Sequence, residues 1–148
     1  MDIKWDIRFL KLAHHIANWS KDPSTQNCAI IVSDDRRIQT TGYNAFPEGI
    51  EDTEERLNNR ELKLENTIHA EVNAVVNAAR DGVRTKGCTM YCTWPPCAPC
   101  ALIIINAGIK RLVTPAVEVP ERWKESCDKA EIKLVEAGVE IHYIEMDE

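Results

Sequence analysis

Four side chains in two short segments have the types and spacing of a catalytic metal site. His69-Ala70-Glu71 is followed, 28 residues after the histidine, by Cys97-Ala98-Pro99-Cys100, with Pro96 directly before the first cysteine. One imidazole and two thiolates give zinc three protein ligands and leave the fourth tetrahedral position open, as in catalytic rather than structural zinc sites. We therefore predict one zinc ion held by His69, Cys97 and Cys100, with water in the open position.

Glu71 is the candidate general acid and base. Zinc lowers the pKa of a bound water from ~16 to about 7, and a carboxylate within hydrogen-bond reach can carry its proton to a leaving group. Side chains two residues apart on a helix do not face the same way, so His69 and Glu71 serve one site only if the histidine lies at the helix boundary. Cys-x-x-Cys alone also occurs in redox pairs and structural zinc sites, but both segments together predict a hydrolytic centre.

The elements that position these residues alternate between helices and strands. Apolar residues at helical spacing, with Pro96 near the first position of one helix and Gly108 just past its end, predict helices at 3–19, 68–79, 97–107 and 123–137. Short apolar or alternating runs predict strands at 28–32, 37–43, 88–93, 111–114 and 139–144. Residues 44–67 are polar and predict a long loop with room for one helical turn.

This order predicts an α/β fold, a three-layer α/β/α domain over residues 1–148 whose five-stranded mixed sheet begins with a hairpin. No segment approaches the ~20 apolar residues of a membrane span, and the first residues lack a secretory pattern. We therefore expect a cytoplasmic protein without a membrane partner. In that compartment the cysteines outside the metal site are expected to be buried thiols, namely Cys28, Cys88, Cys92 and Cys127.

The formal net charge of −6 argues against a polynucleotide substrate. Binding along a nucleic acid depends on lysines and arginines that displace counterions from many phosphates. A single phosphate requires only one local basic cluster. The charge therefore favours a small-molecule substrate, which can be a single nucleotide, over a polynucleotide.

The zinc segments resemble those of the cytidine and deoxycytidylate deaminase superfamily, and more narrowly the chain resembles its dCMP deaminases. Three further segments carry this narrower resemblance: Asp22-Pro23-Ser24-Thr25-Gln26, Gly42-Tyr43-Asn44-Ala45-Phe46-Pro47 and Thr93-Trp94-Pro95-Pro96-Cys97. The resemblance covers nearly the whole domain. It implies a five-stranded sheet with helices on both sides and a homo-oligomer, often a hexamer.

The resemblance also implies substrate contacts. Asn44 would bind the sugar hydroxyl, the backbone N–H of Ala70 would bind the cytosine carbonyl, and the loop Thr93-Trp94-Pro95 would flank the base and its amino group. From the possible phosphate donors we single out Ser24, Thr25 and Arg80; the others are Lys21, Arg56, Arg60 and Lys63. Structural roles remain open as well, with Trp94 in the core, Asn44 shaping a turn, and the cations solvated.

Two departures from the family pattern narrow these expectations. Ala45 follows Asn44 where dCTP-regulated members commonly have glycine, so regulation by dCTP is not implied. Residues 45–68 contain neither cysteine nor histidine, whereas several relatives bind a second, structural zinc in this insertion. We therefore expect one zinc ion per chain.

The resemblance implies hydrolytic deamination of dCMP to dUMP and ammonia, a supply step for thymidylate synthesis. One alternative is deamination of another free cytosine compound, such as dCTP, cytidine or a 5-substituted dCMP. A second is a nucleotide-binding, deaminase-like module without turnover, in which the zinc is closed by a fourth ligand or Glu71 is idle. A tRNA adenosine deaminase would need a basic surface that a net charge of −6 does not supply.

Overall fold

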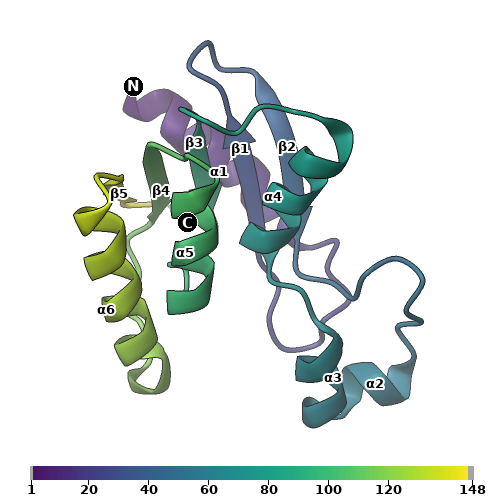
Figure 1. The fold of residues 1–148 in the computed structure, drawn as a ribbon. Helices are drawn as coiled ribbons and strands as arrows, with labels where there is room; N and C mark the ends of the chain where they lie inside the picture. Colours follow the sequence, from purple (N-terminus) through teal and green to yellow (C-terminus); the bar gives the residue numbers. More distant parts are fainter. Residues whose placement is uncertain (1, 147–148) are drawn as a thin grey trace.

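A five-stranded mixed sheet forms the centre of the protein in the computed structural model, which describes residues 2–146 (Figure 1). The strands lie in the order β2 (Ile38–Tyr43), β1 (Cys28–Val32), β3 (Thr89–Cys92), β4 (Arg111–Pro115) and β5 (Glu140–Ile144). β1 is antiparallel to both β2 and β3, whereas β3, β4 and β5 run parallel. The predicted fold class, with its initial hairpin, is confirmed.

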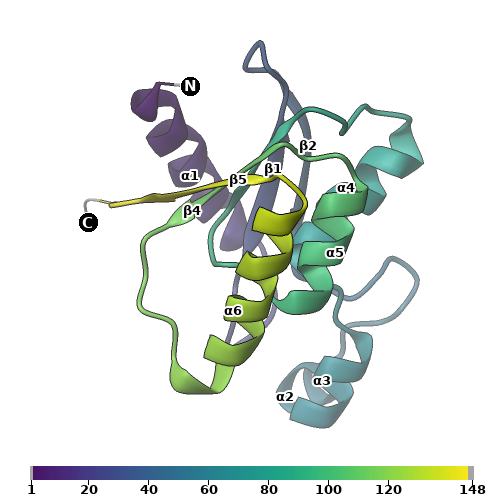
Figure 2. The same cartoon turned by 60° about the vertical axis from the view of Figure 1, so that its left-hand side comes forward.

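Helices cover the two faces of the sheet unequally. Helix α1 (Ile3–Ala17) lies on one face, and α4 (Ala70–Asp81), α5 (Ala98–Asn106) and α6 (Glu121–Glu136) lie on the other (Figures 1 and 2). Successive strand residues point to opposite faces, so Ile30 of β1 packs in the α1 cluster while Ile31 packs in the cluster beneath α4, α5 and α6. None of the helices within residues 2–146 has the length and apolar content of a membrane span.

The predicted loop at 44–67 contains two helices instead of one turn. These are α2 (Glu54–Asn58) and α3 (Arg60–Asn66). Thr53 caps the first by accepting a hydrogen bond from the N–H of Arg56 at 3.2 Å, and Asn59 caps the second by accepting from Leu62 at 3.1 Å. Such side-chain caps satisfy donors that a helix start leaves open, which explains how so polar a segment becomes helical.

Helix α4 packs directly on the edge strand β2, and this contact fixes the start of the helix. A Cβ atom at Gly42 would lie 2.3 Å from the backbone nitrogen of Ala74, so only glycine allows so close an approach. Two amides on α4 also donate to β2, from Asn73 to the carbonyl of Tyr43 at 2.8 Å and from Asn77 to that of Thr41 at 2.9 Å. The helix is therefore held along its length.

A buried ion pair attaches α1 to the other face of the sheet. The guanidinium of Arg111 donates to both carboxylate oxygens of Asp6, at 2.9 and 2.5 Å, and the hydroxyl of Tyr91 donates to the same carboxylate at 2.7 Å. Burial alone would raise the pKa of Asp6, but the bonds from Arg111 and Tyr91 outweigh it and hold the pKa below its ordinary value. The carboxylate is therefore charged in the folded protein.

We expect Asp6→Asn to lower the free energy of unfolding by about 3 kcal/mol at pH 7, because it removes the negative charge from a buried ion pair. A carboxyl with a depressed folded pKa stabilises the fold fully above the unfolded pKa of about 3.9 and loses that contribution as the pH falls further. The difference between wild type and variant in urea unfolding should therefore shrink below about pH 4. The control is Asp35→Asn, which breaks an exposed ion pair with Arg37 and should leave the urea midpoint unchanged. Equal urea midpoints for Asp6→Asn and wild type would contradict the expectation.

Candidate metal centre and substrate site

The three predicted metal ligands meet where two helices begin. His69 is the N-cap of α4 and Cys97 is the N-cap of α5, both with extended backbone, and Cys100 lies in the first turn of α5. The Nδ1 atom of His69 is 3.2 Å from the Sγ of Cys100 and 3.5 Å from the Sγ of Cys97. The helix starts at Ala98, so Pro96 precedes the cap and Pro99 occupies the first turn.

This geometry fits zinc. A tetrahedral ion with Zn–N near 2.0 Å and Zn–S near 2.3 Å places nitrogen and sulfur ligands about 3.5 Å apart. The ligand atoms of His69, Cys97 and Cys100 all lie within 4.8 Å of one another, and within residues 2–146 they form the one such group of three or more. Imidazole nitrogen and thiolate sulfur are also the ligands that zinc prefers.

The electrostatics of the group favour a thiolate at Cys97. A hydrogen bond from the thiol of Cys100, together with the neighbouring imidazole of His69, lowers the pKa of Cys97 far below that of an ordinary thiol. The positive end of the α5 dipole acts in the same direction. The backbone N–H of Ala98, at that helix start, donates to the hydroxyl of Ser126 on α6 at 3.0 Å and so fixes the position of α5.

Glu71 lies beside this group but is not part of it. It is the second residue of α4, and its side chain is buried, with 6% of the residue exposed. Burial raises the pKa of Glu71, while the neighbouring Cys100 and His69 act against that rise. His69 and Glu71 are expected to serve one site only if His69 lies at a helix boundary. His69 is the N-cap of α4, in agreement with this expectation.

Three of the predicted substrate residues surround the same end of the sheet. Thr93 is buried directly after β3, and its hydroxyl accepts from the N–H of Cys28 and donates to Asn27, both at 3.1 Å. Trp94 and Pro95 continue this loop and are half-buried. The thiol of Cys127 donates to the Pro95 carbonyl at 3.9 Å. The loop therefore has fixed supports on β1 and α6.

Asn44 and Ala70 lie close to the start of α4. The Asn44 amide is buried, accepts from the N–H of Asn27 at 2.9 Å and donates to the carbonyl of Thr25 at 2.7 Å. Each end of an amide side chain can make one further hydrogen bond. Ala70 is the first residue of α4, where helix geometry gives its backbone N–H no partner inside the helix.

The three predicted phosphate contacts fall in two places. Ser24 and Thr25 are exposed on the loop that Asn44 holds. The structure does not bring Arg80 to this group. Ten residues of helix separate it from Ala70, about 15 Å along the axis, and its guanidinium meets Glu48 at 3.4 Å on the surface.

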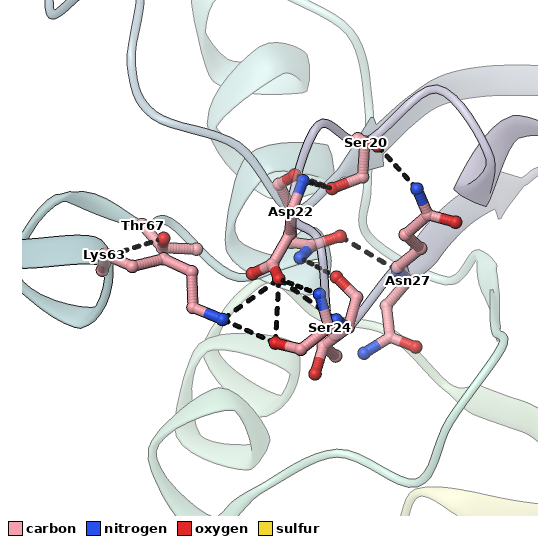
Figure 3. A network of polar contacts seen from close by, with 9 residues as sticks. Ser20, Asp22, Ser24, Asn27, Lys63 and Thr67 are labelled. Carbon is pink, nitrogen blue, oxygen red and sulfur yellow. Dashed lines mark hydrogen bonds and ion pairs between the residues drawn. The ribbon is translucent and has the colours of Figure 1, made fainter. Parts of the chain in front are cut away.

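The structural roles of several residues at the site carry no signal in the sequence, although Lys63 is among the possible phosphate donors. Lys63, Asn27 and Ser126 all lie in polar segments, and each owes its place to a partner at least 28 residues away. Figure 3 shows Lys63 reaching from its helix toward Asp22 and Ser24. A separate cavity of about 760 Å³ opens at the opposite end of the sheet, lined by the charged residues Arg36, Lys110 and Arg111 among others, and contains none of the metal-site residues.

The fold and the three-ligand group together define the class of zinc-binding nucleobase deaminases, in which a glutamate that does not bind the metal serves as acid and base. The family model described as "Cytidine and deoxycytidylate deaminase zinc-binding region" matches residues 3–116. The chain belongs to this family.

Individual relatives extend the likeness over most of the chain. An uncharacterized deaminase from the luxG 3′ region of Aliivibrio fischeri is 37% identical over 97% of this chain and 96% of its own length. The deoxycytidylate deaminase of Homo sapiens is 37% identical over 75% of this chain, which spans 64% of the human protein. In fold, the dCMP deaminase of cyanophage S-TIM5, solved with dCMP and dUMP, matches with a TM-score of 0.78 at 24% identity over 97% of this chain and 99% of that one.

We expect purified protein to contain about one zinc ion per chain, measured by plasma mass spectrometry against protein concentration. Cys100→Ala should lose most of this zinc because it removes one of three ligands. The control is Cys127→Ala, which removes a nearby thiol outside the group and should leave the zinc content unchanged. A Cys100→Ala protein with full zinc content would show that the ion binds elsewhere.

Proposed function

We propose that this chain hydrolyses dCMP to dUMP and ammonia. The observation that carries the proposal is the three-ligand group with a buried carboxylate, Glu71, beside it and outside it. The human relative is named deoxycytidylate deaminase, and the phage structure of the same fold was solved with dCMP and dUMP, the substrate and product proposed here. These names support dCMP over other free cytosine compounds.

In the proposed mechanism His69, Cys97 and Cys100 hold the zinc, and Glu71 moves the protons. Zinc, when bound, supplies a Lewis acid that makes water nucleophilic near neutral pH. The oxygen of water bonds to C4 of the cytosine, and the bond from C4 to the amino nitrogen breaks. The water gives up two protons: Glu71 delivers one to the ring nitrogen N3 and the other to the departing amino nitrogen, which leaves as ammonia while C4 becomes a carbonyl. Burial of Glu71 keeps competing water away from this transfer.

The proposed substrate contacts surround that centre. The N–H of Ala70 donates to the cytosine carbonyl, and the loop Thr93-Trp94-Pro95 flanks the base, with the Trp94 ring suited to packing against a pyrimidine. Asn44 uses its remaining hydrogen-bond capacity on the sugar hydroxyl. Ser24 and Thr25 are the proposed phosphate contacts, and Arg80 is left out because of its distance from the group.

The proposal includes a cytoplasmic homo-oligomer, a hexamer by analogy with the family. None of the six cysteines forms a disulfide, as expected in a reducing compartment. Exposed apolar side chains on the outer helices support assembly with further copies; Leu102 of α5 is 53% exposed, and Ile132 and Val135 of α6 are 69% and 62% exposed.

Zinc-loaded protein should release ammonia from dCMP faster than from dCTP, cytidine or a cytosine-containing oligonucleotide. The expectation follows from a site built for one free nucleotide in an acidic chain. Ammonia release can be followed in a coupled assay with all four compounds at the same concentration. Preference for dCTP or cytidine would assign the runner-up activity, and no release from any of them would reject the enzyme.

Glu71→Gln should keep its zinc and lower kcat for dCMP by ~10²–10⁴-fold, the range for loss of a general acid and base. The amide fills the same space but cannot carry the proton. Glu61→Gln, which alters an exposed glutamate of α3, is the matched control and should keep wild-type turnover. Loss of zinc from the Glu71 variant would instead identify this carboxylate as a ligand.

A further inference from the structure

Lys63 is a buried lysine in a helix that the metal site does not use. It lies on α3, has 8% of its surface exposed, and its Nζ atom is 3.1 Å from the Oδ1 of Asp22 and 2.5 Å from the Oγ of Ser24 (Figure 3). Lysine is almost never buried unless it is paired. Its ammonium therefore has a specific partner 41 residues away in the sequence.

Asp22 is the centre of the loop that carries the proposed phosphate contacts. Its Oδ1 accepts the backbone N–H groups of Ser24 at 2.9 Å and Thr25 at 3.0 Å, besides the bond from Lys63. Burial would raise the pKa of Asp22, but these donors together lower it below the ordinary value. The charged carboxylate thus fixes the backbone at both residues, and the Lys63 ammonium neutralises it.

Hydrogen bonds continue from this loop to the metal site. The carbonyl of Thr25 accepts from Asn44, the Oδ1 of Asn44 accepts from the N–H of Asn27, and the Oδ1 of Asn27 accepts from the hydroxyl of Thr93. Thr93 begins the loop that ends at the ligand Cys97. One continuous network therefore joins α3 in the insertion to the loop between β3 and α5.

We propose that Lys63 is a positioning residue for nucleotide binding, acting through Asp22 on Ser24 and Thr25 and through the loop on Asn44. The inference rests on the proposed function. Lys63 holds the insertion against the loop and cancels the charge of Asp22, whose carboxylate lies 3.1 Å from the hydroxyl of Ser24. Without Lys63 this carboxylate stands uncompensated beside the proposed phosphate position and repels an anionic group.

The repulsion gives the proposal a signature in substrate charge. A Lys63→Met variant keeps most of the length of the side chain and removes its charge. We expect the KM for dCMP to rise about tenfold, the kcat to change by less than about threefold, and the zinc content to stay the same. Product inhibition should show the same dependence on charge. The variant should lose more affinity for dUMP than for deoxyuridine, which lacks the phosphate.

Two variants serve as controls. Lys21→Met removes the same charge from the same loop, but Lys21 makes an exposed ion pair with Asp52 at 3.1 Å, so its KM should stay within about twofold of wild type. The double variant Lys63→Met with Asp22→Asn removes both charges while the amide oxygen still accepts from Ser24 and Thr25. It should recover most of the affinity for dUMP that Lys63→Met loses.

A measurement without substrate separates this inference from the proposed function. Hydrogen exchange of the peptide covering 22–27 should be faster in Lys63→Met than in wild type, because the amides of Ser24, Thr25 and Asn27 are bonded within the network. Exchange in β4 should be unchanged. An unaltered exchange rate, equal losses for dUMP and deoxyuridine, or a double variant no better than Lys63→Met overturns the inference. Failure of the wild type to deaminate dCMP overturns the proposed function instead.

Discussion

The meeting of two helix starts at one end of the sheet is the constraint on which the site depends. His69 and Cys97 are both N-cap residues, so their backbones are extended while the helices behind them are rigid. The 3.5 Å between the His69 Nδ1 and the Cys97 Sγ is therefore set by how α4 and α5 pack. The contact at Gly42 fixes α4, and the bond from Ala98 to Ser126 fixes α5. Backbone packing away from the metal thus determines ligand geometry.

The local pattern of apolar residues, glycines and prolines in the sequence is sufficient to predict most of the fold. The strand predicted at 28–32 has the same bounds as β1, and Gly82, which is predicted to end its helix, adopts the left-handed conformation at the C-cap of α4. The loop predicted at 44–67 is wrong because the two helices in this segment are short and polar. They have no apolar periodicity that would reveal them. Their capping residues, Thr53 and Asn59, were the only local signal.

The central residues of the site are predictable because His69 and Glu71 are close in sequence at one helix start, and Cys97 and Cys100 are close in sequence at another. Lys63 and Asp22 are 41 residues apart, and Asp6 and Arg111 are 105 apart, so only the tertiary structure selects them as partners. The expectation for Arg80 came from its helix alone. Helix α4 begins at the metal site, and its last turn lies about 15 Å away along the axis. Two residues on the same helix therefore need not belong to the same site.

A chain with a net charge of −6 can accept an anionic nucleotide only if the charges near the site are balanced locally. The two thiolates offset the charge of a divalent ion, and Lys63 offsets Asp22 at 3.1 Å. Excess acidic charge on the exposed surface acts through water and is screened within about 10 Å at moderate ionic strength. A buried carboxylate beside the proposed phosphate position is not screened in this way. Neutralising Asp22 is therefore expected to matter more for binding the proposed phosphate than the total charge of the protein does.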